Sequence, residues 1–173
     1  AHSDRDTVVN LTNQAYFNLA GHTGGRVDDH VLTIQASRYT PCGAGNIPTG
    51  ELASVAGTPL DLRQGARLGD HLGDTFLAAS KGYDHNLVLD LPAEDVESWP
   101  AATLWCPRTG IAMSMSTTLE GVQLYTAGFL TPRQGKGGAM YGPGQAVCLE
   151  TQHFPDAVHH PAFPTPVLPA GTQ

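Results

Sequence analysis

Alternation of apolar and polar positions is strongest in the second half of the chain and predicts β-strands there. Residues two apart in a strand share one face of a sheet, so period-two alternation gives one apolar and one polar face. The segments with this pattern, or with a short run of β-branched and apolar residues, are 7–9, 30–36, 87–89, 102–106, 111–117, 122–129 and 146–152. Hairpin connections are expected at 107–110 and 119–121, and Met113 and Met115 are expected in the core.

Residues 37–85 lack periodicity and contain many Gly and Pro residues, which predicts irregular structure. Only 66–72 indicates one short helical turn. Loops this long are uncommon in compact domains unless they are functional. Asp84 and His85 are expected just before the strand at 87–89, where a turn Asp that caps backbone amides is the structural alternative to a functional role. The pattern as a whole predicts an all-β fold.

Composition narrows the class of protein. The 173 residues are 40% hydrophobic and 14% charged, which is enough apolar material for a core and too little charge for a disordered chain. The length fits one domain or part of a larger one. The formal net charge is −7 and the 9 Lys and Arg residues are scattered, so neither nucleic acid nor a membrane surface is expected as a partner. No apolar run approaches the roughly 20 residues that span a bilayer. The first residues do not resemble a signal peptide, and a periplasmic or secreted origin with the signal removed stays open.

The metal-ligating residue types show no metal-site spacing. Cys42, Cys106 and Cys148 are odd in number, far apart and without a CxxC pair, so neither a zinc site nor a disulfide framework is expected. Three free thiols favour a reducing compartment, and we expect a cytoplasmic protein. The 8 His residues lack HExxH or similar spacing, so we expect no metal site.

Candidate chemistry appears in three places. Glu150 lies near the end of the strand at 146–152, among uncharged neighbours, where the pattern alone favours a solvated strand carboxylate. Residues 13–17 hold one Asn, one Gln and two aromatic residues. They form either an edge strand with inward aromatics or a sugar cleft, in which aromatic faces cover C–H surfaces and amides bind hydroxyls. Gln123 and Tyr125 share a strand face and could line a pocket.

Seven short blocks, in one order, carry a resemblance to a known family. They are 10–21 (NLTNQAYFNLAG), 39–41 (YTP), 47–51 (IPTGE), 57–63 (GTPLDLR), 82–86 (GYDHN), 121–126 (GVQLYT) and 149–157 (LETQHFPDA). Through these seven blocks, which follow one another in the family's order, the chain resembles the aldose 1-epimerase (galactose mutarotase) family. The resemblance implies a large antiparallel β-sandwich, sometimes called a supersandwich, and interconversion of the α and β anomers of free aldoses.

The same resemblance assigns roles to individual residues. It implies that Glu150 is the general base that removes the anomeric hydroxyl proton. It implies that Asp84 and Gln123 bind the sugar hydroxyls. Acid and base act together, the ring opens to an aldehyde, the C1–C2 bond rotates and the ring closes again. The expected partner is a free aldohexose such as galactose or glucose, and no metal or organic cofactor is expected.

Two departures from the family pattern stand out. After Thr12-Asn13 the family carries a His that protonates the ring oxygen, whereas this chain carries Gln14, whose amide donates a hydrogen bond but cannot transfer a proton at neutral pH. The chain also resembles only about the C-terminal half of a family member, so we expect 1–173 to be a single partial domain with an incomplete sandwich. Open sheet edges would then invite self-association or pairing with the missing N-terminal half.

Three functions remain open from the sequence. The leading one is an aldose 1-epimerase. The alternative from another class is a catalytically silent carbohydrate-binding or interaction module, because of Gln14 and the absent half. The third is a glycosidase that uses Glu150 and Asp84 as paired carboxylates, which must lie within roughly 10 Å of each other. A phosphosugar epimerase is disfavoured by the sparse Arg residues.

Overall fold

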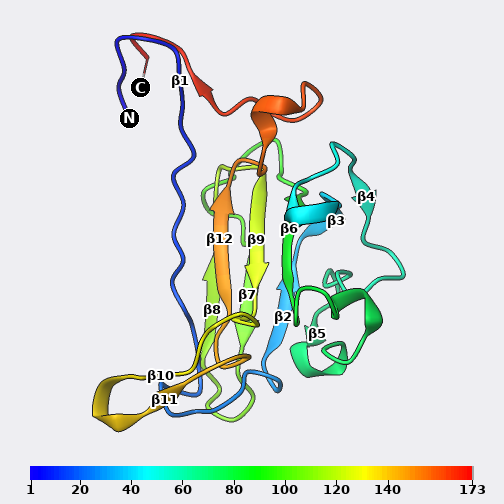
Figure 1. The fold of residues 1–173 in the computed structure, drawn as a ribbon, viewed down its shortest axis with the longest axis vertical. Coiled ribbons are helices and arrows are strands. Elements are labelled where there is room, and N and C mark those ends of the chain that lie inside the picture. The colour runs from blue at the N-terminus through cyan, green and yellow to red at the C-terminus, as the bar shows by residue number, and fades with distance from the viewer. Residues whose placement is uncertain (173) are drawn as a thin grey trace.

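The computed structural model describes residues 1–172 and contains two packed antiparallel β-sheets (Figure 1). The larger sheet has the strand order β12-β9-β6-β3-β4 and the smaller one β5-β2-β7-β8. The strands of the larger sheet are β3 Ala36–Tyr39, β4 Ala53–Ser54, β6 Asp84–Leu89, β9 Gly121–Tyr125 and β12 Cys148–Gln152. Those of the smaller sheet are β2 Val31–Ile34, β5 Ala66–Arg67, β7 Ala102–Trp105 and β8 Ala112–Met115. The predicted antiparallel β-sandwich is confirmed.

The core lies between the two sheets and follows from the alternation. Leu32 and Leu104 of the smaller sheet and Leu87 and Leu124 of the larger one are fully buried in one cluster. Their strand neighbours face outward. Met113 and Met115 pack against this cluster as predicted, although both are only partly buried.

Several predicted strands are shorter than the pattern indicated, because the chain turns earlier. The strand expected at 122–129 ends at Tyr125, and Ala127 has a φ of 58°, a left-handed conformation that a strand cannot continue through. Asp84 and His85 lie within β6 rather than before it. The helical turn expected at 66–72 is β5 followed by the 3-10 turn η2, Leu68–Asp70.

Two of the connections that cross between the sheets differ from expectation. The predicted single strand at 30–36 divides at Gln35 into β2 of the smaller sheet and β3 of the larger one. The predicted hairpin at 119–121 is wrong, since β8 and β9 belong to different sheets. β9 buries its apolar face in the core, and Met113 and Met115 of β8 pack, partly buried, against the same core. The hairpin at 107–110, which joins β7 and β8, is confirmed.

The remaining elements lie at the two ends of the sandwich. The strand β1 Thr7–Val8 pairs with β13 Val167–Leu168, and β10 Arg133–Gln134 pairs with β11 Met140–Tyr141. From β1 the N-terminal segment runs the length of the sandwich to the end that carries β10 and β11 (Figure 1). The other 3-10 turns are η1 Ala44–Asn46, η3 Thr75–Leu77, η4 Lys136–Gly138 and η5 Ala157–His159. Within residues 1–172, no helix has both the length and the apolar character needed to cross a bilayer.

Candidate functional site

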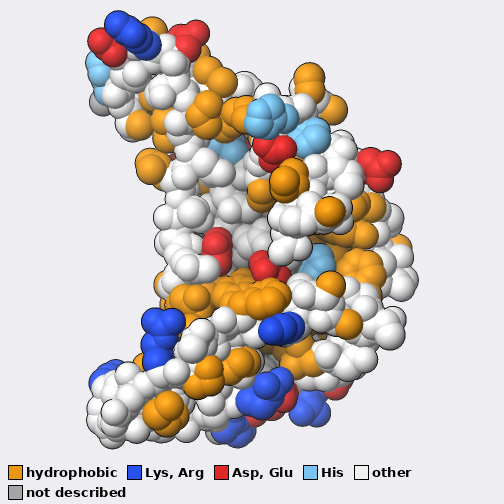
Figure 2. All heavy atoms as spheres, in the orientation of Figure 1, with side chains coloured by type: hydrophobic (Ala, Val, Ile, Leu, Met, Phe, Trp, Pro, Cys, Tyr) orange, Lys and Arg blue, Asp and Glu red, His pale blue; other side chains and the backbone are white. Residues whose placement is uncertain are grey.

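The outer face of the larger sheet carries a cavity that contains all four predicted site residues. The strands β6, β9 and β12 lie side by side, and their register places Asn86, Gln123 and Glu150 in one row across the sheet. A cavity of about 400 Å³ opens over this row. Its lining consists of Gln14, Tyr16, Asp84, Gln123, Tyr125, Phe129, Glu150, Gln152 and Pro155. Figure 2 shows the molecule hollowed at mid-height, with acidic side chains exposed in the hollow.

The Glu150 carboxylate occupies an environment that disfavours its charge. Burial raises the pKa of Glu150, and the negative charge of Asp84 raises it further, while a polar contact from the side chain of Gln14 lowers it. Burial is the largest of these influences. A carboxylate whose pKa is raised toward neutral holds a proton more tightly once it has taken one, which suits proton abstraction. The solvated-strand reading of Glu150 is therefore the weaker one.

Asp84 and Gln123 form a hydrogen-bonded pair beside Glu150. Nε2 of Gln123 donates to Oδ1 of Asp84 at 2.7 Å. Both side chains are only partly buried, so each keeps hydrogen-bonding groups that can face the cavity. A carboxylate and an amide in this arrangement can accept from one sugar hydroxyl and donate to another.

Aromatic rings form a second part of the cavity lining. The rings of Tyr16 and Tyr125 meet edge to face with their centroids 6.4 Å apart. The hydroxyl of Tyr125 accepts a hydrogen bond from the backbone N–H of Phe129 at 3.0 Å. Residues 13–17 contribute to both the cavity and the core: Tyr16 is 45% exposed and lines the cavity, whereas Phe17 packs against the core.

Hydrogen bonds hold the segment that carries Gln14 and Tyr16 against the sandwich. Phe17 and Val147 exchange backbone hydrogen bonds of 2.9 and 2.8 Å. The Asn18 side chain donates to the carbonyl oxygens of Gly25 and Gln145 at 2.8 and 2.9 Å. These contacts fix the backbone three residues after Gln14 and thereby place the side chain of Gln14 at the cavity.

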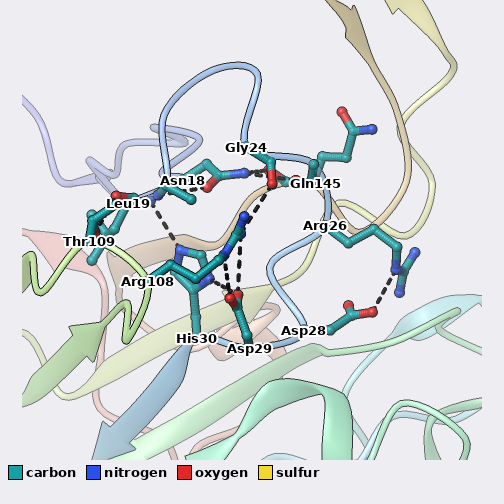
Figure 3. A network of polar contacts seen from close by, with 12 residues as sticks. Asn18, Leu19, Gly24, Arg26, Asp28, Asp29, His30, Arg108, Thr109 and Gln145 are labelled. Carbon is teal, nitrogen blue, oxygen red and sulfur yellow. Dashed lines mark hydrogen bonds and ion pairs between the residues drawn. The ribbon is translucent and has the colours of Figure 1, made fainter.

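The structure brings Asp29, His30 and Cys106 close enough to resemble a metal site, with their ligand atoms within 4.8 Å of one another. Both imidazole nitrogens of His30 are engaged, however. Nε2 accepts from the backbone N–H of Leu19 at 3.1 Å, and Nδ1 lies 3.0 Å from Oδ1 of Asp29 (Figure 3). A ligating His needs a free nitrogen lone pair, so these residues do not fit a metal ion. The contacts of His30 with Leu19 and Asp29 stabilise the loop before β2.

An adjoining cavity of about 350 Å³ shares Asp84, Gln123 and Pro155 with the first one. His85 lies in its lining, and its ring packs against those of Tyr39 and Phe76. Burial lowers the pKa of His85, and its Nδ1 accepts a hydrogen bond from the backbone N–H of Asp84 at 3.1 Å. The imidazole is therefore neutral near pH 7. Asp84 and His85 point to opposite sides of β6, as expected for neighbours in a strand.

Sequence reasoning did not single out Phe129 and Gln152 as cavity residues. Phe129 follows the end of β9, in a turn that periodicity did not predict. Alternation in the sequence placed Gln152 on the same strand face as Glu150. The hydrogen-bond partners of Gln152 depend on the register of β12, β9 and β6, which the sequence does not give. Tyr16 lies in residues 13–17, for which the sequence left both an edge strand and a sugar cleft open.

Comparisons with known proteins agree on one family. The family model described as aldose 1-epimerase matches residues 1–173. The galactose mutarotase of Homo sapiens is 42% identical over 174 residues, which cover 100% of this chain and 49% of that protein. The aldose 1-epimerase of Escherichia coli (strain K12) is 34% identical over 164 residues, covering 94% and 46%. A GalM/aldose epimerase homologue from C. elegans, solved by crystallography, superimposes with a TM-score of 0.81 at 25% identity, covering 98% of this chain and 50% of that one. The chain thus spans about half the length of the curated relatives that it matches.

Proposed function

This chain belongs to the aldose 1-epimerase family, and from this premise we propose that residues 1–173 are a single partial domain that contributes the C-terminal half of a mutarotase site. The substrate in this proposal is a free aldohexose such as galactose or glucose. The reaction is the interconversion of its α and β anomers. Relatives named galactose mutarotase and aldose 1-epimerase support this at the level of the family.

One observation carries the proposal. Glu150, whose pKa is raised by burial, lines the same cavity as the hydrogen-bonded pair of Asp84 and Gln123. The pair can fix the hydroxyls of a sugar while Glu150 faces its anomeric hydroxyl. Tyr16 adds an exposed aromatic ring for the apolar C–H face of the sugar.

In the proposed reaction Glu150 removes the proton from the anomeric hydroxyl. The electron pair of that O–H bond forms the carbonyl, and the bond between C1 and the ring oxygen breaks. The ring oxygen takes a proton, the C1–C2 bond rotates, and the reverse steps close the ring with the other configuration. Gln14 can donate a hydrogen bond to a sugar oxygen but cannot supply this proton. In our proposal the proton comes from water or from the N-terminal half of the family fold.

A second candidate function rests on Gln14. Because Gln14 stands where the family pattern has the acid His, the cavity can bind a sugar without turning it over. In that case the chain is a carbohydrate-binding module with an intact Asp84 and Gln123 pair. The glycosidase reading is weaker, because family membership favours an isomerase.

We also propose a partner and a compartment. The strand orders place β8 and β12 at sheet edges within the described residues, and such edges invite further strands. The proposed partner is the N-terminal half of the family fold, with self-association as the outcome when that half is lacking. All three cysteines are free thiols, which favours a reducing compartment such as the cytoplasm.

Polarimetry on freshly dissolved α-D-glucose and α-D-galactose tests the function. The chain is measured alone and after fusion to the N-terminal half of the human galactose mutarotase, with Glu150→Gln as the control in both forms. Rotation that is accelerated in either form and lost on Glu150→Gln supports the epimerase. Sugar binding without accelerated rotation in both forms supports the binding module. Neither binding nor rotation in the fused form would overturn both proposals.

A further inference from the structure

We propose that Gln152 is a positioning residue that sets the orientation of the Gln123 amide and, through it, of the Asp84 carboxylate. The part of this inference that concerns sugar binding rests on the proposed function. The part that concerns the hydrogen-bond network does not, and the experiment below separates the two.

A continuous line of side-chain hydrogen bonds carries the inference. Nε2 of Gln152 donates to Oδ1 of Asn86 at 3.0 Å and to Oε1 of Gln123 at 3.4 Å. Nε2 of Gln123 then donates to Oδ1 of Asp84 at 2.7 Å. At the other end, Nδ2 of Asn86 donates to Oγ1 of Thr40 at 3.3 Å. The line runs from Thr40, the residue after β3, through β6, β9 and β12 and ends at the cavity.

The direction of the donors fixes every amide in the line. An amide group has one acceptor oxygen and one NH₂ donor group. Because the NH₂ of Gln152 faces both Asn86 and Gln123, each of these must present its oxygen. Gln123 is thereby left with its NH₂ toward Asp84. The opposite orientation would set an amide oxygen against a carboxylate oxygen and would leave the NH₂ of Gln152 without this acceptor.

Burial makes this orientation costly to change. Gln152 is 8% exposed and Asn86 3% exposed, so an unpaired donor or acceptor on either would be removed from water. Gln123 is less buried, and both Gln123 and Gln152 line the cavity. The rigid part of the network is therefore Asn86 with Gln152, and it acts on Gln123 from the two strands that flank β9.

Gly121 provides the space that the network needs, which is an independent observation. Gly121 lies between Val88 and Gln152 in the register of the sheet. A Cβ atom at position 121 would lie 2.8 Å from Oδ1 of Asn86 and 3.0 Å from Cδ1 of Phe154. The backbone oxygen of Gln152 would also lie 3.0 Å from it, so the amide of Asn86 is the nearest of three groups that favour glycine here. The Gln152 side chain crosses the sheet over a residue that has no side chain.

The first arm of the test observes the network without any sugar. The side-chain amide NMR signals of Gln123 are compared in the parent, in Gln152→Met and in Thr151→Val, each made in the fused full-length form. Gln152→Met keeps the approximate volume and removes both N–H donors, whereas Thr151 lies on the opposite strand face. We expect the Gln123 signals to move toward those of a solvent-exposed Gln in Gln152→Met and to stay in place in Thr151→Val. Unchanged signals in Gln152→Met would overturn the network.

The second arm measures sugar binding with the same three proteins. We expect the Kd for galactose to rise about tenfold or more in Gln152→Met, the scale of one hydrogen bond to a charged group. Discrimination against a deoxygalactose that lacks the hydroxyl bound by Asp84 should fall together with affinity, which a general loss of packing would not produce. If the amide signals move and sugar binding does not, the network stands and the proposed sugar role of Asp84 and Gln123 fails.

A second variant tests the same network if Gln152→Met does not fold. In Gly121→Ala the Gln152 amide is retained, but the added methyl group displaces Asn86 and Gln152. The same shift of the Gln123 signals is expected. Wild-type signals and wild-type affinity in a folded Gly121→Ala protein would overturn the proposal.

Discussion

Gln123 lies diagonally across from Asp84, with 2.7 Å between Nε2 of the amide and Oδ1 of the carboxylate, since the residue directly opposite Gln123 on β6 is Asn86. The diagonal contact joins two neighbouring strands at the cavity. It makes the two predicted sugar-binding residues a single unit, so removal of either one changes the other.

This coupling predicts a non-additive pair of substitutions. Asp84→Ala and Gln123→Ala should each weaken galactose binding, and the double variant should lose less than the sum of the two. Contacting polar residues typically show an interaction free energy of about 0.5–3 kcal/mol. Isothermal titration of the four proteins gives this value. The control cycle combines Asp84→Ala with Val158→Ala, an exposed residue on η5, and should be additive. Additivity in both cycles would contradict the coupling.

A second prediction concerns the proposed base. Glu150→Gln should lower mutarotation in the fused form by about 10²–10⁴-fold, the usual contribution of a general base. Sugar binding should persist, because the amide is nearly isosteric with the carboxylate and Asp84 and Gln123 are untouched. Polarimetry and a sugar titration measure the two quantities. Glu51→Gln, at an exposed position outside the cavity, is the matched control. Full activity in Glu150→Gln would assign the base to another group.

The strands of the sandwich could be predicted because each has one apolar and one polar face. How the strands are distributed between the sheets could not. Alternation at 111–117 and 122–129 looks the same whether the two strands pair in a hairpin or face each other across a core. Gln35 likewise gives no local signal that the chain changes sheets there, and both crossings depend on tertiary packing.

The candidate site could likewise be predicted from the sequence only in part. Alternation alone predicted that Gln123 and Tyr125 share a face, and both line the cavity. The roles of Glu150, Asp84 and Gln14 came from the family resemblance and stay predictions. The contact of Gln152 with Asn86 requires the register of β12, β9 and β6, which no single segment encodes.

The third prediction concerns Gln14. Gln14→His in the fused form should raise mutarotation, because a His has an unperturbed pKa near 6.5 and can protonate the ring oxygen near neutral pH. The expected gain is about 10²–10⁴-fold. The Kd for sugar should change little, since Gln and His both donate a hydrogen bond. Gln134→His, on the exposed strand β10, controls for an added imidazole. A parent that already turns over at the rate of Gln14→His would show that the acid lies elsewhere.

The fourth prediction concerns assembly. The chain alone should not behave as a well-folded monomer, because β8 forms one edge of the smaller sheet and nearby Trp105 and Ile111 are 43% and 51% exposed. Light scattering and thermal unfolding measure this. Ala112→Lys places a charge at the exposed edge and should reduce self-association. Fusion to an N-terminal half should sharpen unfolding. A sharply cooperative monomer at all concentrations would mean that the chain closes its own edges.

The fifth prediction links the chemistry of Glu150 to stability. Its pKa in the fold is raised, chiefly by burial, above the value of about 4.3 expected in the unfolded chain. The folded state therefore holds the Glu150 proton more tightly than the unfolded state. Below the unfolded pKa, Glu150 is protonated in both states and ionisation has no effect on stability. As the pH rises through the unfolded and then the folded pKa, the charge destabilises the fold, and the effect is complete above the folded pKa.

Glu150→Gln removes that charge, so the variant should gain stability relative to the parent as the pH rises above about 4, while it loses activity. Urea midpoints of the fused forms at matched pH values measure the difference, in which titrating groups distant from Glu150 cancel. Gln14→Ala should move the rise to higher pH, because the contact from Gln14 lowers the pKa of Glu150. A stability difference between Glu150→Gln and the parent that does not vary with pH would contradict the raised pKa. A gain in stability where activity is lost is the behaviour of a residue retained for chemistry rather than for folding.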